Sequence, residues 1–497
     1  MNMTFNRRTF LKGAAAVSAA AAGGCLTSTT PAPHFRKPGE KLNFAAIGAG
    51  GKGLSDWPSF VRHGENLVCL CDVDRGMLDN ALATYQKLGG DPAKVKCYAD
   101  YRKMLDENPH LDAVIVTSPD HMHATQAIRA MRMGMNVYVQ KPLVRTLWEL
   151  DRFGTVAREA GVLTQMGNQG SSAKTFRRGV EVIRSGMLGD IREAHVWTNR
   201  PVWPQGHYTD EAANGPAEAV PEGFDWDLWL GTAKPRNFRL AYPKGTPQSE
   251  RGGVYHRFNW RSFYDFGTGA LGDMACHLMN LPFRGLELGA VTAAECAHIE
   301  DRAALAYPMR SAVTLTFKAR KSRFRAGACL PEVKLTWYDG RIKPAAELMP
   351  QAIAVFKEVP LQGCLLIGDK GMLLSTGGYG LESFIALKGE DKVKSIYKHE
   401  ACLSIPQHLP TRPEKAEAAH YPEFIDAVKG IGPVIPEVHS RCYADIEHSI
   451  PLVESMLVGC VAQRLGEKVA WNSTNRLFDG AAANDLIRPY MRSGFEM

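Results

Sequence analysis

The chain has 497 residues, of which 45% are hydrophobic and 22% are charged, and its net charge is +7. This length suits two or three domains, and the composition is that of a globular protein. The 59 basic residues form no Lys/Arg block, and no segment of the body is strongly apolar over 18 residues. We therefore expect neither a nucleic-acid partner nor a transmembrane helix.

The N-terminal residues have the features of an export signal. The segment NRRTFLK, with its paired arginines, resembles the twin-arginine signal by which bacteria export folded proteins, and a short apolar run follows over 14–22. We therefore interpret 1–25 as a signal peptide of a periplasmic or otherwise exported protein. The signal ends in AGGC, which resembles a lipoprotein processing site, although Ala22 stands where a larger aliphatic residue is usual. A lipid anchor at Cys25 is thus an alternative to simple cleavage.

A polar linker over 26–40 is followed by a strand, a glycine turn, a helix and a second strand. The first apolar run is LNFAAIG, the turn is GAGGKG, and the second run, NLVCLCD, ends in Asp72. Gly48 permits a tight turn, Gly50 lets the backbone approach a pyrophosphate, and Gly53 lets the helix pack on the sheet. Asp72 would accept hydrogen bonds from ribose hydroxyls and repel a 2′-phosphate. The pattern predicts a dinucleotide site that prefers NAD to NADP.

Strands and helices continue to alternate after this unit. Strands are expected at 112–118 and 136–140, and helices at 122–134 and 146–160. This alternation predicts a doubly wound parallel sheet, a Rossmann domain over 41–165, with ligands beyond the carboxyl ends of its strands. TSPDHMH and QKPL lie at those ends, so their histidines should face the cofactor. The predicted cofactor-binding residues are Gly48, Gly50, Gly51, Lys52, Gly53, Asp72, Ser118, Pro119, His121, Gln140, Lys141 and Asn168.

Several motifs in the expected order resemble the Gfo/Idh/MocA oxidoreductases. They are GAGGKG, CDVD, TSPDHMHA, GMNVYVQKPL, GTGALGDMACHLMN, HYPEFIDAVKG and LVGCVAQRLGEKVAWN. The resemblance implies a substrate-binding α+β domain over 166–497, built on an open, mostly antiparallel sheet, and homo-oligomers that pair through this sheet as dimers or tetramers. It also implies that Lys141 lies beside the nicotinamide. Gln140 departs from the family's glutamate and removes a negative charge beside that lysine.

The resemblance further implies a catalytic pair, Asp273 and His277. GDMACHLMN has helical character, so side chains four residues apart share one face. We expect Asp273 to orient His277, stabilise its protonated form and raise its pKa, which suits a general base. The predicted catalytic residues are Lys141, Asp273 and His277. No cysteine pair or Cys/His spacing indicates a metal site, and the ten cysteines after Cys25 allow disulfides without requiring them.

Aromatic residues are dense between 197 and 266. They account for 14 of these 70 residues, against 9% of the whole chain. Aromatic faces stack on sugar rings, while interleaved polar groups can hold the hydroxyls. We expect a carbohydrate subsite with Trp203, Arg261, Asp273 and His277 as substrate-binding residues. Packing of a large loop region is the alternative for any single aromatic residue.

An exported enzyme has no free NAD pool to exchange with, so we expect a tightly bound NAD that each cycle returns to its starting state. One hypothesis is a sugar oxidoreductase that oxidises a ring hydroxyl, at C3, and reduces a second compound. The alternative is a redox-neutral glycosidase that oxidises transiently and eliminates the glycosidic bond. Members of that glycosidase branch have tryptophans where this chain has Pro119-Asp120-His121. A non-catalytic sugar-binding protein is a second alternative.

Overall fold

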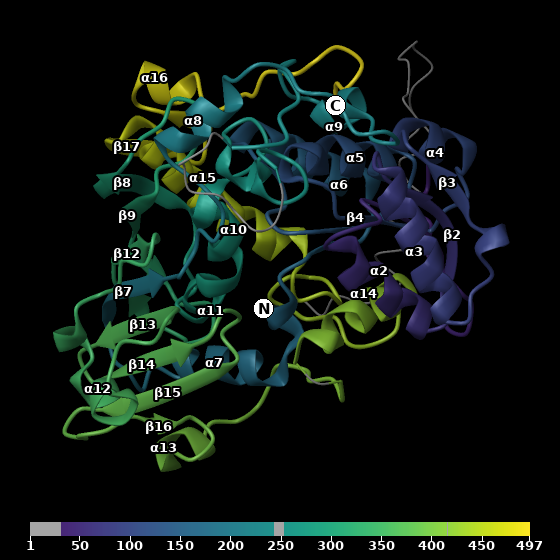
Figure 1. Cartoon of the computed structure of the whole chain (residues 1–497). Coiled ribbons are helices and arrows are strands. Elements are labelled where there is room, and N and C mark those ends of the chain that lie inside the picture. Colours follow the sequence, from purple (N-terminus) through teal and green to yellow (C-terminus); the bar gives the residue numbers. More distant parts are fainter. Residues whose placement is uncertain (1–30, 243–252, 415) are drawn as a thin grey trace, which may run out of the picture.

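The computed structural model describes residues 31–242, 253–414 and 416–497. The predicted signal peptide and Cys25 lie outside these residues. Two sheets organise the chain, with the Rossmann sheet and the strands of the larger sheet on opposite sides of the molecule and α10 between them (Figure 1). The predicted fold class, a Rossmann domain joined to an α+β domain, is confirmed.

The N-terminal sheet has six strands in the order β3-β2-β1-β4-β5-β6, and every pair is parallel. This is the doubly wound order expected of a dinucleotide-binding domain. The central strands are short, fully buried apolar runs, as a sheet covered on both faces requires. The strands are β1 (Asn43–Ile47), β2 (Asn66–Cys71), β3 (Lys96–Tyr98), β4 (Ala113–Val116), β5 (Asn136–Val139) and β6 (Thr164–Met166).

The helices of this domain begin and end where local chemistry favours it. Asp74 caps the helix after β2 by accepting a hydrogen bond from the Gly76 amide, and Thr146 and Glu149 form a capping box on the helix after β5. That last helix ends at Gly161 in the left-handed conformation. The helices are α2 (Gly53–Arg62), α3 (Arg75–Lys87), α4 (Tyr101–Glu107), α5 (Asp120–Arg132) and α6 (Leu147–Ala160).

The second sheet has ten strands in the order β16-β15-β14-β13-β7-β12-β9-β8-β17-β18. Only the pair β7 and β12 is parallel among its pairs, so the sheet is mostly antiparallel, as predicted. Its strands are β7 (Ile191–Trp197), β8 (Val291–Glu300), β9 (Arg310–Phe317), β12 (Val333–Tyr338), β13 (Gly363–Gly368), β14 (Gly371–Thr376), β15 (Glu382–Leu387), β16 (Lys394–Ser395), β17 (Lys468–Asn472) and β18 (Leu477–Phe478). A separate two-stranded sheet pairs β10 (Arg320–Lys321) with β11 (Cys329–Leu330).

The helices after the Rossmann domain include α10, which carries Asp273 and His277. They are α7 (Lys174–Arg184), α8 (His207–Ala213), α9 (Trp226–Leu230), α10 (Gly269–Leu278), α11 (Asn280–Gly285), α12 (Pro350–Phe356), α13 (Glu400–Leu403), α14 (His420–Val428), α15 (Ile446–Leu465) and α16 (Ala481–Asn484). The 3₁₀ turns are η1 (Pro92–Lys94), η2 (Gln169–Ser172), η3 (Asn259–Ser262), η4 (Ala346–Leu348) and η5 (Ala416–Ala419). No helix of the described residues is long and apolar enough to cross a membrane.

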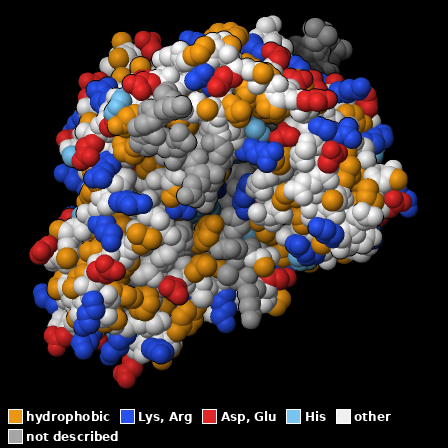
Figure 2. Space-filling view, in the orientation of Figure 1, with side chains coloured by type: hydrophobic (Ala, Val, Ile, Leu, Met, Phe, Trp, Pro, Cys, Tyr) orange, Lys and Arg blue, Asp and Glu red, His pale blue; other side chains and the backbone are white. Residues whose placement is uncertain are grey.

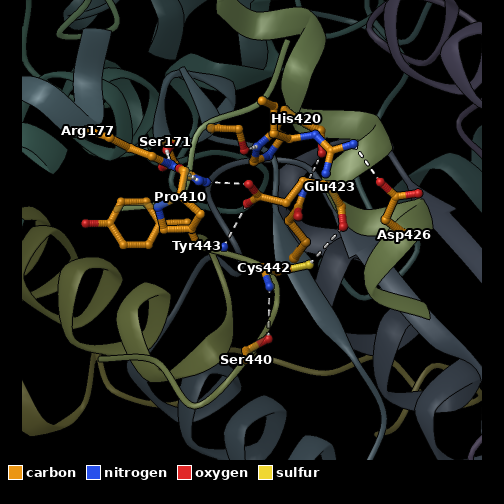
Figure 3. Close-up of polar contacts among 12 residues, drawn as sticks. Ser171, Arg177, Pro410, His420, Glu423, Asp426, Ser440, Cys442 and Tyr443 are labelled. Atoms are coloured by element: carbon orange, nitrogen blue, oxygen red, sulfur yellow. Dashed lines mark hydrogen bonds and ion pairs between the residues drawn. The ribbon is translucent and has the colours of Figure 1, made fainter. Parts of the chain in front are cut away.

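Helix α14 packs against the Rossmann domain although it comes late in the chain. Its residues Tyr421 and Phe424 belong to one buried apolar cluster with Phe44 and Phe60. The buried Arg177–Glu423 ion pair and the hydrogen bond from the Tyr443 amide to Glu423 fix the other side of this helix (Figure 3). The helix thereby fastens the late part of the chain to the domain that carries the glycine turn.

The aromatic-rich region from 197 to 266 is largely loop, and its rings mostly pack on one another. Phe224, Trp229, Phe238, Tyr255 and Phe266 are members of one buried cluster. The packing interpretation therefore holds for most of these aromatics. The ten cysteines of the described residues are all free thiols.

Candidate active site

The glycine turn after β1 has the geometry that its sequence predicts. Gly48 has φ +82°, and a side chain there would place Cβ 2.7 Å from the amide nitrogen of Ser118. A Cβ on Gly53 would lie 2.0 Å from the carbonyl oxygen of Gly48, so only glycine lets α2 begin this close to the turn. Gly53 therefore packs beneath the turn and does not line the cavity above it.

A cavity of about 410 Å³ opens over the carboxyl ends of the Rossmann strands. Its position matches the crevice in which doubly wound sheets bind ligands. The predicted residues that line it are Gly48, Gly50, Gly51, Lys52, Asp72, Ser118, Pro119, Gln140, Lys141 and Arg261. Ten predicted residues thus line one cavity, which extends from the glycine turn to Lys141.

Asp72 follows β2 and is held by backbone amides. Its carboxylate accepts hydrogen bonds from the amides of Gly50 and Asp74, both at 3.1 Å. Burial outweighs these bonds and raises the pKa of Asp72 to about 6. The carboxylate is therefore oriented at the cavity wall and titrates close to neutral pH.

Lys141, which follows β5, pairs with Asp273 on α10. Its Nζ lies 2.7 Å from Oδ1 of Asp273 and donates a second hydrogen bond to the Asp273 carbonyl at 2.9 Å. Nε of Arg261 lies 3.2 Å from the same Oδ1. Burial alone would raise the pKa of Asp273, but the two cations outweigh it and hold that pKa well below its usual range. The result is an ionised carboxylate that fixes Lys141 at the cavity edge.

His277 does not receive the partner that the sequence analysis expects. Asp273 is engaged by Lys141 and Arg261, while the His277 ring lies edge-on to Tyr379 at 4.5 Å between centroids. Burial, and then the positive charge of Lys141, lower the pKa of His277 well below its usual value. The expectation of a raised pKa is therefore wrong: the imidazole is neutral at pH 7 and can accept a proton in that form.

Asp120, the first residue of α5, is a site residue that the sequence analysis does not single out. It lines the cavity, and its Oδ2 accepts a hydrogen bond from Oγ1 of Thr268 at 2.9 Å. Burial raises the pKa of Asp120 to about 7, partly countered by the charge of Arg261. Because Thr268 precedes α10, this bond joins the Rossmann domain to the helix that carries Asp273. The sequence feature that could have identified Asp120 is its place in TSPDHMH, directly after a parallel strand.

Gln140 forms a hydrogen bond with a buried acid, Asp56. Its Nε2 donates to Oδ2 of Asp56 at 2.6 Å, and Asp56 also accepts from Tyr421 at 2.6 Å and pairs with Lys52 at 2.9 Å. Burial raises the pKa of Asp56. A glutamate at position 140 would set a second carboxylate against Asp56, so the departure from the family pattern has a local physical reason.

The far wall of the cavity comes from the aromatic-rich region. Segment 256–261 lines the cavity, as do Leu228 and Trp229 of α9. Nε2 of His256 lies 3.0 Å from Oδ2 of Asp74, and Nη2 of Arg257 lies 3.5 Å from the same oxygen. Burial lowers the pKa of His256, so its neutral ring donates to Asp74. We call segment 256–261 the closing segment, since it covers the glycine-turn side of the cavity from the other domain.

Two backbone hydrogen bonds extend this attachment. The Arg75 amide donates to the carbonyl of Gly223 and the Asp225 amide donates to the carbonyl of Val73, each at 2.9 Å. The loop after β2, which carries Asp72, is therefore fixed to the aromatic-rich region by backbone as well as side chains. None of these contacts was expected from the sequence, because the partners lie about 150–180 residues apart.

Comparison with known proteins agrees with this geometry. Residues 42–168 match the GFO_IDH_MocA family, described as an oxidoreductase family with an NAD-binding Rossmann fold. The match identifies the N-terminal part of the chain as an NAD-binding Rossmann domain of the Gfo/Idh/MocA type. Residues 4–24 match the twin-arginine translocation pathway signal sequence, which indicates export to the periplasm or beyond.

Two curated relatives that this chain matches are named as glycosyl hydrolase family 109 proteins. The one from Shewanella sp. (strain W3-18-1) is 26% identical over 203 residues, covering 37% of this chain and 44% of the relative. The one from Stenotrophomonas maltophilia (strain K279a) is 37% identical over 137 residues, covering 26% of this chain and 28% of the relative. The chain thus spans less than half of the length of these relatives.

Among solved structures, an inositol dehydrogenase homolog from Azotobacter vinelandii, complexed with NADH and myo-inositol, is similar to this chain. The match has a TM-score of 0.55 and 17% sequence identity, and it covers 88% of this chain and all of the other. At this identity the likeness supports the fold, including the second domain beyond the family match.

Besides Gly53, five predicted residues do not line the cavity: His121, Asn168, Trp203, Asp273 and His277. His121 is buried with Nε2 at 3.1 Å from the Trp229 carbonyl, because α5 turns it toward α9 and turns His123 to the cavity. Trp203 is buried behind Arg261 and donates to Gln205 at 2.8 Å. Asp273 and His277 also lie behind the cavity wall, next to Lys141.

Two of the predicted residues that do not line the cavity have buried polar atoms without partners in the described part of the chain. Both amide atoms of Asn168 and Nδ1 of His277 are buried without a hydrogen-bond partner among the described residues. Such atoms cost free energy unless something pairs with them. The glycine turn and the oriented Asp72 make a site that fits a dinucleotide. Among the described residues no group of three or more acidic, His or Cys side chains is placed to hold a metal ion.

Proposed function

We propose that this protein is an exported sugar oxidoreductase that keeps one NAD bound through both halves of its cycle. It oxidises a ring hydroxyl, at C3, and returns the hydride to a second carbonyl compound. The observation that carries this proposal is the cavity between the glycine turn and Lys141, which the closing segment covers from the other domain. Export supports it, since a released cofactor would not be replaced outside the cytoplasm.

The described residues have distinct roles in this reaction. Bound NAD supplies the hydride acceptor for the alcohol and the hydride donor for the second carbonyl. Lys141, fixed by Asp273, donates a hydrogen bond to the substrate oxygen and stabilises negative charge on it. His277 is neutral, and we assign to it the hydroxyl proton when the alcohol is oxidised and its return when the second carbonyl is reduced. Because His277 lies behind the cavity wall, this role requires the substrate hydroxyl to reach its Nδ1, which is unpaired among the described residues.

Asp72 supports NAD rather than NADP. Its carboxylate faces the cavity beside the glycine turn, where it would accept hydrogen bonds from ribose hydroxyls and repel a 2′-phosphate. Arg257, a cation that lines the cavity on this side, is already paired with Asp74. The proposal therefore predicts tighter binding of NAD than of NADP.

A redox-neutral glycosidase is the second candidate, supported by the printed names of the curated relatives. In this reaction oxidation of the hydroxyl to a ketone acidifies the neighbouring C–H bond. A base removes that proton and the glycosidic bond breaks, releasing the aglycone. Water then adds to the unsaturated sugar, and the returning hydride and a proton restore the alcohol. The same three residues would serve, with Lys141 holding the ketone oxygen through every step.

One experiment separates these candidates. Purified mature protein, with no NAD added, is mixed with aryl glycosides and, separately, with free sugars. The absorbance of reduced nicotinamide is followed, and the products are identified by mass spectrometry. Absorbance that rises and persists until a second carbonyl compound is added supports the oxidoreductase. Aglycone release with oxidised cofactor at the end supports the glycosidase. Sugar binding without any turnover would overturn both and leave a sugar-binding protein.

We further propose that the exported protein forms a homo-oligomer through its open sheet and carries a lipid at Cys25. Light scattering on the mature protein tests the first part, and a monomer would contradict it. Membrane fractionation of the natural chain and of Cys25→Ala tests the second. A lipid anchor predicts that only the natural chain sediments with membranes.

A further inference from the structure

Residues 492–495 lie across one end of the cavity, far in sequence from the Rossmann motifs. Phe495 lines the cavity and is only 4% exposed. Figure 1 shows this end of the chain beside α9 and α5. We call residues 492–495 the fastening segment, because they contact both domains.

Arg492 attaches the fastening segment to α9. Its guanidinium donates to the carbonyls of Gly231 at 2.9 Å and Asp227 at 2.6 Å, and it pairs with the Asp227 carboxylate at 2.5 Å. The Arg492 amide also donates to the carbonyl of Thr232 at 3.1 Å. Four bonds from one residue make this the anchor of the segment on the aromatic-rich region.

The next residues attach to the Rossmann domain. Gly494, at φ +85°, turns the chain so that its carbonyl accepts from Arg102 at 2.6 Å. The Phe495 carbonyl accepts from Oγ1 of Thr125 at 3.0 Å. The Phe495 ring contacts two guanidinium groups, with its centroid 4.4 Å from that of Arg102 and 4.8 Å from that of Arg492. The ring is thereby held in one position at the cavity wall.

The position of this ring identifies the part of a dinucleotide that it would meet. The pyrophosphate binds at the glycine turn and the adenosine ribose at the acid after β2, here Asp72. Ala99 and Tyr101, which line the cavity with Phe495, follow β3, the next strand outward from β2. Lys141 and the reactive ring lie in the other direction, beyond β4. Phe495 therefore lies at the adenine end.

We propose that Phe495 is the residue that closes the adenine end over the bound cofactor, and that NAD leaves only when the fastening segment detaches from α9. An aromatic ring held by two cations gives an apolar, rigid wall against the base. This inference rests on the proposed retention of NAD and assigns it to named residues. It predicts a kinetic effect on cofactor exchange, separate from the chemistry at Lys141.

The test measures NAD release from the full-length exported protein. Phe495→Ala removes the wall, and Arg492→Ala removes the anchor without creating a gap in the cavity lining. Tyr490→Ala is the matched control, because Tyr490 lies in the same stretch but is 49% exposed and does not line the cavity. NAD content is measured after desalting, and the release rate is followed with an added dehydrogenase that consumes free NAD.

We expect both test variants to release NAD at least about tenfold faster than the natural protein, since roughly one buried aromatic contact is lost. Tyr490→Ala should release it at the natural rate. Circular dichroism melting checks folding, and Phe495→Leu, which keeps an apolar side chain, should lie between the natural protein and Phe495→Ala. Equal release rates for the natural protein, Phe495→Ala and Arg492→Ala would overturn the inference. A natural protein that binds no NAD would instead overturn the proposed function.

Discussion

The two walls of the cavity are built differently. The Rossmann wall comes from strand ends and the glycine turn, and its nucleotide-binding part, the turn and Asp72, is fixed by neighbours close in sequence. The opposite wall comes from the closing segment and the fastening segment, which reach the cavity from positions far along the chain. The first wall determines which chemistry is available, and the second determines how long a cofactor stays. Substitutions of Lys141 or of charged groups in the first wall should therefore alter turnover. Substitutions in the second wall should alter how long the bound NAD is retained.

Lys141→Met gives the largest effect and tests the chemical role of the Rossmann wall. We expect kcat to fall by about 10²–10⁴-fold, because the substrate oxygen loses its charged hydrogen-bond donor. The NAD content of the purified variant should stay as in the natural protein. Lys174→Met, at an exposed lysine on α7, is the control. Loss of NAD together with activity would show that Lys141 acts in cofactor binding instead.

Gln140→Glu tests whether the Rossmann wall is electrostatically adjusted to Asp56. It replaces a donor with a carboxylate against a buried acid whose pKa is already raised. We expect the free energy of unfolding to fall by about 1–3 kcal/mol in denaturant titrations. The double variant Asp56→Asn/Gln140→Glu should recover part of that loss. An unchanged unfolding midpoint for the single variant would contradict the pairing.

His256→Ala tests whether the second wall limits the release of bound NAD. It removes the donor to Asp74 and frees the closing segment from the loop that carries Asp72. We expect NAD release about tenfold faster, with kcat under saturating NAD changed little by comparison with Lys141→Met. His298→Ala removes an exposed histidine that pairs with Glu300 and serves as the control. Release at the natural rate would show that the closing segment does not limit exchange.

The pH dependence of NAD affinity gives the smallest effect. The pKa of Asp72 is raised from its usual value near 4 to about 6, so the carboxylate is mostly ionised at pH 7 and mostly protonated at pH 5. Only the ionised form accepts hydrogen bonds from both ribose hydroxyls. The dissociation constant should be flat above pH 7 and should rise by up to about tenfold per pH unit below pH 6. Asp72→Asn should bind NAD more weakly and without this slope in calorimetric titrations.

The Rossmann wall was predictable because its signals are local. A strand, a glycine turn and an acid lie within about 30 residues, and the structure has β1, α2 and β2 where the sequence places them. The helical spacing of Asp273 and His277 was also predicted correctly, but not their partners. Asp273 turns to Lys141 and Arg261, which only the packing of α10 against the Rossmann domain determines. Burial then lowers the pKa of His277, an effect that four-residue spacing cannot reveal.

The second wall could not be predicted, because its contacts join residues that are distant in sequence and are set by the packing of the two domains. His256 meets Asp74, and Phe495 meets Arg102, across separations that no periodicity in the sequence indicates. The density of aromatics between 197 and 266 indicated a functional region but not its role. Most of these rings form a core of their own, and segment 256–261 uses that core as a support.

The packing of α14 has a consequence for the order of events during synthesis. Tyr421 and Phe424 complete the apolar cluster that contains Phe44 and Phe60, and Tyr421 also donates to Asp56 beneath the glycine turn. A ribosome must add more than 350 residues after Phe60 before these contacts can form. The nucleotide-binding domain is therefore synthesised first, but its apolar core is completed only after α14 has been synthesised. Under the proposed function, the cofactor would therefore be loaded after translation and before export by the twin-arginine route.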